Sequence, residues 1–211
     1  MAARMQPYAK IAALLVAVTA CAPRAVAERA RAEPHEHESA LVATAGAGHT
    51  VADVRFMQDM IGHHAQAIVM AAMAPTHGAG DNVLKLAQKI DISQRDEIDM
   101  MKQWLRERHQ AVPDSVHMHG MHMPGMLTAA QLAQLDAARG RAFERLFLTF
   151  MIQHHEGALL MVEGLFDSPG AAQDSDIFRF ATDVDADQRD EIFVMRTLLD
   201  MLDTNPGSAL R

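Results

Sequence analysis

The block Met60-Ile61-Gly62-His63-His64 returns later in the chain as Met151-Ile152-Gln153-His154-His155. A second block, Gln94 to Met101, returns as Gln188 to Met195. Further residues recur at the spacing of the histidine block: Phe56, Ala67 and Met70 return as Phe147, Ala158 and Met161. Two blocks repeated in the same order predict a duplicated structural unit.

Placed on a helix at about 100° per residue, the repeated residues form narrow stripes, and no segment alternates with the period of a strand. Capping residues before the stripes and Pro or Gly after them set the limits of each helix. The expected helices cover about 50–74, 81–108, 128–166 with a break or kink near Gly140, and 175–202. The sequence therefore predicts an all-α fold, a four-helix bundle made of two repeated helical hairpins.

Polar residues interrupt the apolar stripes: His63 and Glu97 in the first unit, His154 and Glu191 in the second. Buried imidazoles and carboxylates are costly unless they are paired. One interpretation pairs His63 with Glu97 and His154 with Glu191, and treats the methionines as core packing. Adjacent histidines point about 100° apart, so one of each pair is expected to face another site or solvent.

The other interpretation is a metal site. Met60 with His63 or His64, and Met151 with His154 or His155, can converge on one ion from a single helix. Thioether and imidazole together suit Cu(I) or Ag(I), and imidazole also suits Cu(II). The Glu/Met segments add further candidate ligands: Glu97, Met101, Glu191 and Met195. Zinc would favour thiolates, which this chain does not offer beyond Cys21.

A segment rich in His and Met lies between the two repeats, at 117–126. Its Gly and Pro content predicts a loop, and a loop has no core face that would explain so many methionines. The candidate ligands are His117, Met118, His119, Met121, His122, Met123 and Met126. This pattern indicates copper capture.

The N-terminus resembles an export signal, with Arg4 and Lys10 before a short apolar stretch. Val18 to Cys21 resembles a lipobox, which predicts a signal peptide at 1–20 and lipidation of Cys21; cleavage after Ala27 is the alternative. Residues 21–49 are expected to be a flexible tether, 50–203 the helical domain and 204–211 a tail. The net charge of −8, without a basic stripe, argues against binding to nucleic acid.

The two histidine blocks, the Gln-Arg-Asp-Glu-Ile segments at 94–98 and 188–192 and the lipoprotein-like leader resemble the domain-of-unknown-function 305 family. The resemblance covers about residues 50–203. It implies an exported, ferritin-like helical bundle and, for CopM-type copper-binding proteins, binding of Cu(I), Cu(II) or Ag(I) through Met and His. The methionines, histidines and glutamates of the repeated blocks match the family pattern, whereas the His/Met segment at 117–126 does not belong to it.

The predicted function is an envelope lipoprotein, periplasmic or on the cell surface, that sequesters copper or transfers it. Its expected partners are metal ions, a membrane through the lipid on Cys21, and other envelope proteins that handle copper. No catalytic residue is assigned. One alternative is a ferritin-like metal oxidase built on His63, His154, Glu97 and Glu191, although such sites typically use Glu-x-x-His pairs, which this chain lacks. The other is a structural lipoprotein whose His–Glu pairs only fasten the bundle.

Overall fold

The computed structural model describes residues 43–114 and 123–204. Within these ranges it contains helices and no strand, apart from one isolated bridge between Gly46 and His49. The elements are α1 (Val51–Ala71), the 3-10 turn η1 (Ala74–Thr76), α2 (Asp81–Glu107), α3 (Ala129–Ala137), α4 (Gly140–Phe166) and α5 (Ser175–Thr204). The predicted all-α class is confirmed.

The start of α1 is fixed by the capping box expected from the sequence. The Thr50 backbone N–H donates to Asp53 Oδ2 at 2.7 Å, and the Asp53 N–H donates to Thr50 Oγ1 at 3.2 Å. The other oxygen of this buried carboxylate accepts from the Ala172 N–H at 2.7 Å. Asp53 therefore caps α1 and also fastens the turn between α4 and α5.

The third predicted helical region is divided in two, as the break expected near Gly140 implies. Ala138 and Arg139 separate α3 from α4, and Gly140 has a φ of +55°. The Gly140 N–H donates to the His77 backbone oxygen at 2.7 Å, and His77 Nε2 lies 3.0 Å from the Asp136 backbone oxygen. These bonds hold the α3–α4 corner against the turn that precedes α2.

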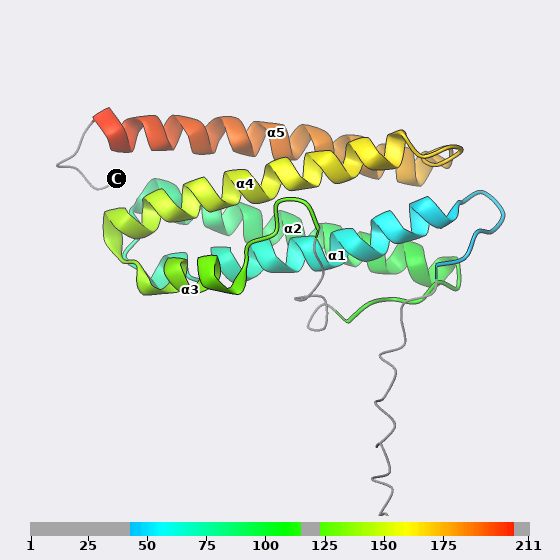
Figure 1. Ribbon diagram of the computed structural model, residues 1–211, viewed down its shortest axis with the longest axis horizontal. Coiled ribbons are helices and arrows are strands. Elements are labelled where there is room, and N and C mark those ends of the chain that lie inside the picture. Colours follow the sequence, from blue (N-terminus) through cyan, green and yellow to red (C-terminus); the bar gives the residue numbers. More distant parts are fainter. Residues whose placement is uncertain (1–42, 115–122, 205–211) are drawn as a thin grey trace, which may run out of the picture. The chain divides into compact units, whose positions relative to one another are not determined.

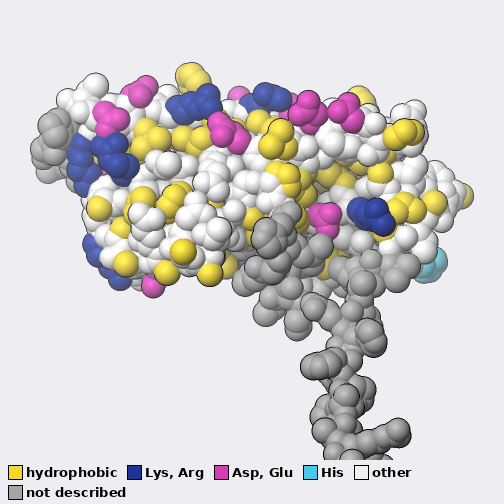
Figure 2. Space-filling model, viewed as in Figure 1, with side chains coloured by type: hydrophobic (Ala, Val, Ile, Leu, Met, Phe, Trp, Pro, Cys, Tyr) yellow, Lys and Arg dark blue, Asp and Glu magenta, His cyan; other side chains and the backbone are white. Residues whose placement is uncertain are grey.

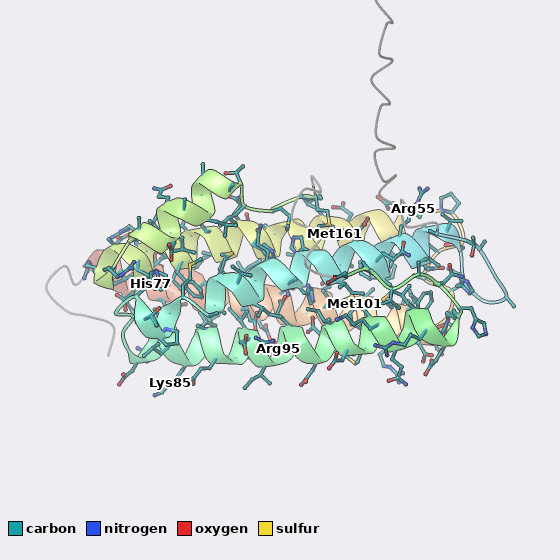
Figure 3. The ribbon with its side chains drawn as sticks, turned by 90° about the horizontal axis from the view of Figure 1, so that it is seen from below. Arg55, His77, Lys85, Arg95, Met101 and Met161 are labelled. Carbon is teal, nitrogen blue, oxygen red and sulfur yellow. The ribbon has the colours of Figure 1, made fainter. Side chains whose placement is uncertain are left out.

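The long helices pack in pairs, α1 along α2 and α4 along α5, and the pairs meet where α1 packs against α4 (Figure 1). Charged side chains such as Lys85 and Arg95 extend outward from α2, whereas Met101 is completely buried (Figure 3). Among the described residues, no helix is both long and apolar enough to cross a bilayer.

The buried apolar residues form two separate clusters, which we call the Phe56 cluster and the Phe143 cluster. The Phe56 cluster includes Val54, Met57, Met60, Ile61, Ile98, Met101, Leu105, Ala158, Val162 and Val184. The Phe143 cluster includes Ala67, Met70, Leu86, Ile90, Phe147, Met151, Ile192, Met195 and Leu198. Along each long helix, one cluster ends where buried polar residues begin, and the other cluster starts beyond them.

The residues between the two clusters form a polar layer that crosses all four long helices. Its members are His63, His64, Gln94, Glu97, His154, His155, Gln188 and Glu191, and Glu97 is the most exposed of them at 8%. The fold thus places the repeated polar residues at one level, between two apolar cores.

Candidate metal centre

The four repeated histidines lie inside the polar layer, and each is at most 1% exposed. The space-filling view of one face is consistent with this burial, because histidine surface is visible only at one end (Figure 2). Neither member of either pair faces solvent, so of the two expected alternatives, another site or solvent, the first applies. The chain of rings runs from His64 through His63 and His154 to His155, with centroid distances of 6.4, 3.8 and 6.2 Å between successive rings.

The second histidine of each pair binds the glutamate of its own hairpin. His64 Nε2 hydrogen-bonds Glu97 Oε2, and His155 Nε2 lies 2.7 Å from Glu191 Oε2. The pairing expected from the sequence, which used the first histidine of each pair, is wrong. The reason is rotational, because one residue further along α1 or α4 turns the side chain about 100° toward the neighbouring helix.

The first histidine of each pair faces the opposite hairpin instead. The rings of His63 and His154 lie 3.8 Å apart between centroids, at 38° to each other. His63 Nε2 is 3.1 Å from the Pro124 backbone oxygen, and a carbonyl oxygen can only accept. The proton of neutral His63 is therefore on Nε2, and its Nδ1 carries the lone pair.

The same argument applies to the histidines that donate Nε2–H to glutamates, since a carboxylate accepts the hydrogen bond. In their neutral form, His64 and His155 therefore also present an unprotonated Nδ1. Within the polar layer, five buried imidazole nitrogens have no hydrogen-bond partner among the described residues: Nδ1 of His63, His64 and His155, and both nitrogens of His154. Imidazole oriented by a carboxylate is the arrangement that metal-binding histidines commonly have.

Burial keeps the central imidazoles neutral. It lowers the pKa of His63 to about 3, with repulsion from His64 as the next cause. Burial, followed by repulsion from His63 and then His155, also lowers the pKa of His154 well below its usual value. Neutral imidazole is the form that binds metals, so these two rings need not lose a proton first at neutral pH.

A backbone segment, 123–127, covers this centre where α1 and α4 meet. The Leu127 N–H donates to Gln66 Oε1 at 2.6 Å, and Gln66 Nε2 donates back to the Leu127 oxygen at 3.1 Å. On α4, a methyl group at Gly157 would lie 2.1 Å from the Pro124 backbone oxygen. Gln66 and Gly157 hold corresponding positions of the repeat, so one helix binds the segment and the other makes room for it.

The four methionines of the repeated blocks are completely buried on the two sides of the polar layer. Met60 and Met101 belong to the Phe56 cluster, and Met151 and Met195 belong to the Phe143 cluster. All four therefore pack in the apolar cores. Among the described residues, no three His, Cys, Asp or Glu side chains are grouped so that they could hold a metal ion.

Part of the predicted His/Met loop lies outside the described residues: His117, Met118, His119, Met121 and His122. Its last two methionines, Met123 and Met126, are half-buried. Both lie in the segment 123–127, whose Pro124 backbone oxygen hydrogen-bonds His63. The described end of the loop therefore lies beside the polar layer.

The sequence analysis missed several residues of the centre. Gln94 and Gln188 are buried, and the Oε1 atom of each has no partner among the described residues. Their recurrence in the repeat was the signal that could have identified them. Lys89, whose Nζ lies 3.3 Å from Glu191 Oε1, has no counterpart of the same charge in the repeat and gave no such signal.

Paired helices around a buried layer of histidine and glutamate define an all-α protein with a polar interior. The chain belongs to the DUF305 family, because the pattern of that domain of unknown function matches residues 53–199. Among curated proteins, none matches this chain.

Solved structures of the family are similar to the chain over most of its length. A DUF305 protein from Streptomyces coelicolor is 29% identical with a TM-score of 0.63, covering 74% of this chain and 95% of its own. A DUF305 fragment from Deinococcus radiodurans is 31% identical with a TM-score of 0.62, covering 73% and 99%. CopM in its Cu(I)-bound form is 28% identical with a TM-score of 0.56, covering 70% and 95%.

Proposed function

We propose that this protein binds copper ions in the cell envelope and sequesters or transfers them. The observation that carries the proposal is the set of buried imidazole nitrogens without partners at the centre of the polar layer. An unsatisfied buried polar atom costs about 1–3 kcal/mol. A ligand that engages these nitrogens would remove that cost, and a metal ion is the ligand that neutral imidazoles favour.

The donor set fits copper better than harder metals. His63 and His154 would bind through ring nitrogen, and the flanking methionines would add thioether sulfur after a local side-chain shift. Nitrogen with thioether suits Cu(I) and Ag(I), and the imidazoles also accept Cu(II). Glu97 and Glu191 already hold His64 and His155, so their role would be to orient those rings.

Related structures support this choice of metal. CopM has been solved in Cu(I)-bound, Cu(II)-bound and silver-bound forms, which are 28%, 29% and 27% identical to this chain. We extend their metal binding to this protein as part of the proposal. The His/Met segment at 117–126 would collect ions beside the centre, and several ions per chain would then bind.

The proposal includes the architecture and the cellular location predicted from the sequence. The two helix pairs would form a ferritin-like four-helix bundle that arose by duplication of one hairpin. Residues 1–20 would be removed as a signal peptide, and lipid on Cys21 would anchor the mature chain through the tether at 21–49. Delivery to other envelope copper-handling proteins would proceed by exchange of ligands, without turnover of a substrate.

The test is a titration of the full chain with Cu(I) against a competing chelator. Replacement of His63 and His154 by Asn should weaken binding by at least roughly tenfold, the effect of losing about 1.4 kcal/mol. The matched control is His77→Asn, which removes a buried histidine outside the polar layer. The proposal fails if the wild type binds no tighter than a free Met/His peptide, or if all three proteins bind alike.

A second candidate is a structural role, favoured by one specific observation. His64–Glu97 joins α1 to α2, and His155–Glu191 joins α4 to α5, so each pair connects the two helices of one hairpin. In that case copper would leave the thermal unfolding temperature unchanged, and Glu97→Gln would lower it equally with and without the metal. A bound ligand must instead raise the stability of the folded state.

A further inference from the structure

The repeat breaks its charge pattern at one pair of positions beside the polar layer. Lys89 on α2 and Asp183 on α5 each lie eight residues before the glutamate of their own helix. Lys89 reaches across to Glu191 on α5, with its Nζ 3.3 Å from Oε1. The residue that corresponds to Lys89 in the other half of the repeat is Asp183, which lies near Glu97 and is acidic.

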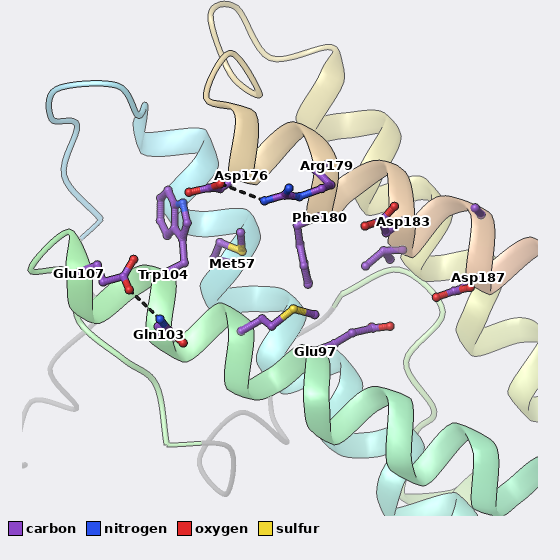
Figure 4. Close-up of a pocket in the computed structure, with 13 residues that line it drawn as sticks. Met57, Glu97, Gln103, Trp104, Glu107, Asp176, Arg179, Phe180, Asp183 and Asp187 are labelled. Atoms are coloured by element: carbon purple, nitrogen blue, oxygen red, sulfur yellow. Dashed lines mark hydrogen bonds and ion pairs between the residues drawn. The ribbon is translucent and has the colours of Figure 1, made fainter.

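The consequence is an open, acidic pocket between α2 and α5 (Figure 4). It has a volume of about 490 Å³, and Glu97 lines it together with Asp183 and Asp187. Two thioethers also line it, the buried Met57 and the exposed Met100. Carboxylates attract cations, and thioethers select soft ones, so the lining suits ions such as Cu(I) and Ag(I).

Glu97 connects this pocket to the centre. Its Oε2 holds His64 Nε2, while no described residue donates a hydrogen bond to Oε1. The residue is 92% buried, and it reaches from α2 toward the side of α5 that carries Asp183 and Asp187 (Figure 4). Glu191, by contrast, is 2% exposed and is covered by Lys89. The polar layer is therefore open to a pocket at Glu97 and covered by a cation at Glu191.

We propose that the α2–α5 pocket is the entrance through which soft metal cations reach the buried histidines, with Glu97 as the last carboxylate before His64. This inference rests on the proposed copper-binding function and adds the direction of entry. The ion meets the exposed Asp183, Asp187 and Met100 first, and then the buried Met57 and Glu97. Further along α2 and α5, beside Glu191, the ammonium group of Lys89 repels cations.

The carboxylates on the rim of the pocket repel one another. Burial raises the pKa of Asp187, the neighbouring carboxylate of Glu97 raises it further, and the ammonium group of Lys89 lowers it. Arg179, the basic side chain in the pocket lining, is bound to Asp176 at 3.2 Å on the same helix. A cation that enters between Asp183 and Glu97 would relieve this repulsion.

The test measures how fast the full chain takes up Ag(I), which avoids redox chemistry. Trp104 is the only tryptophan of the chain and lines the pocket, so its fluorescence in stopped flow reports the arrival of the ion. Asp183→Lys places near Glu97 the charge that Lys89 places near Glu191. At about 10 mM ionic strength it should slow association roughly tenfold, and the difference should shrink as salt screens the charges.

Two variants act as controls. Asp200→Lys makes the same change of net charge on an exposed part of α5 outside the pocket, and should leave the rate within about twofold. Lys89→Asp removes the cation beside Glu191 and should not slow uptake. The entrance is refuted if wild-type protein binds Ag(I) but Asp183→Lys does not slow it, or if Asp200→Lys slows it equally. If wild-type protein binds no Ag(I), the proposed function itself fails.

Discussion

The neutral state of His63 makes the metal-free fold sensitive to acid. Burial lowers its pKa to about 3 in the folded protein, whereas an unfolded histidine titrates near its ordinary value of 6.5. Between these two values the unfolded chain binds more protons than the folded chain. Stability is therefore complete above about pH 6.5 and is lost progressively as the pH falls toward 3.

The size of the effect follows from the two pKa values. On going from about pH 7.5 to about pH 5, His63 alone should lower the free energy of unfolding by about 2 kcal/mol. His154 is shifted in the same direction and adds to the loss. The measurement is urea unfolding at both pH values with a chelator present, because bound metal would compete with protons.

The variant His63→Asn isolates this contribution. It removes the group that the unfolded chain protonates, so its own loss of stability over the same pH range should be smaller by about 2 kcal/mol. His109→Asn, which removes an exposed histidine, should behave like the wild type. Equal losses in the wild type and His63→Asn would show that His63 is not kept neutral by burial.

Three further outcomes follow from the packing. Gly157→Ala should lower the free energy of unfolding by about 1–3 kcal/mol, because the new methyl group lies 2.6 Å from the Gly125 Cα and must displace that backbone. Gly164→Ala on the same helix, where nothing lies within 4 Å, should be neutral or stabilising in urea unfolding. Thr50→Ala should cost about 1 kcal/mol by breaking the capping box of α1, and an unchanged unfolding midpoint would contradict this. Met60→Leu should change the free energy of unfolding by less than about 1.5 kcal/mol but weaken Cu(I) binding in the chelator titration described above. Met70→Leu, within the Phe143 cluster, should leave Cu(I) binding unchanged.

The helices could be predicted closely because their signals are local. The Thr50 capping box and the Pro75-Gly78 turn lie within a few residues of the ends of α1, and both depend only on residues close together in the sequence. The break before Gly140 could be located for the same reason. The hydrogen bond from the Gly140 N–H to the His77 backbone oxygen could not be predicted, because it joins segments that are distant in the sequence.

The centre could be predicted only in part. Periodicity placed His63, His154, Glu97 and Glu191 on inward faces, and all four are buried. It could not decide which histidine of a pair meets Glu97, because that choice depends on how α1 is rotated relative to α2. The contact between Pro124 and His63 could not be predicted either, because Pro124 belongs to a segment that is not part of the repeat.

The polar layer also determines how the helices align lengthwise. Two apolar cores rich in methionine would tolerate many axial registers, because methionine adapts to irregular spaces. A slip of α2 by one turn, about 5.4 Å, would carry Glu97 into an apolar cluster and leave His64 without its partner. Leaving a buried hydrogen-bonding group without its partner in this way costs roughly 1–3 kcal/mol, which disfavours the shifted register. A variant with leucine throughout the layer would lose this constraint, and its helices would be free to settle in more than one alignment.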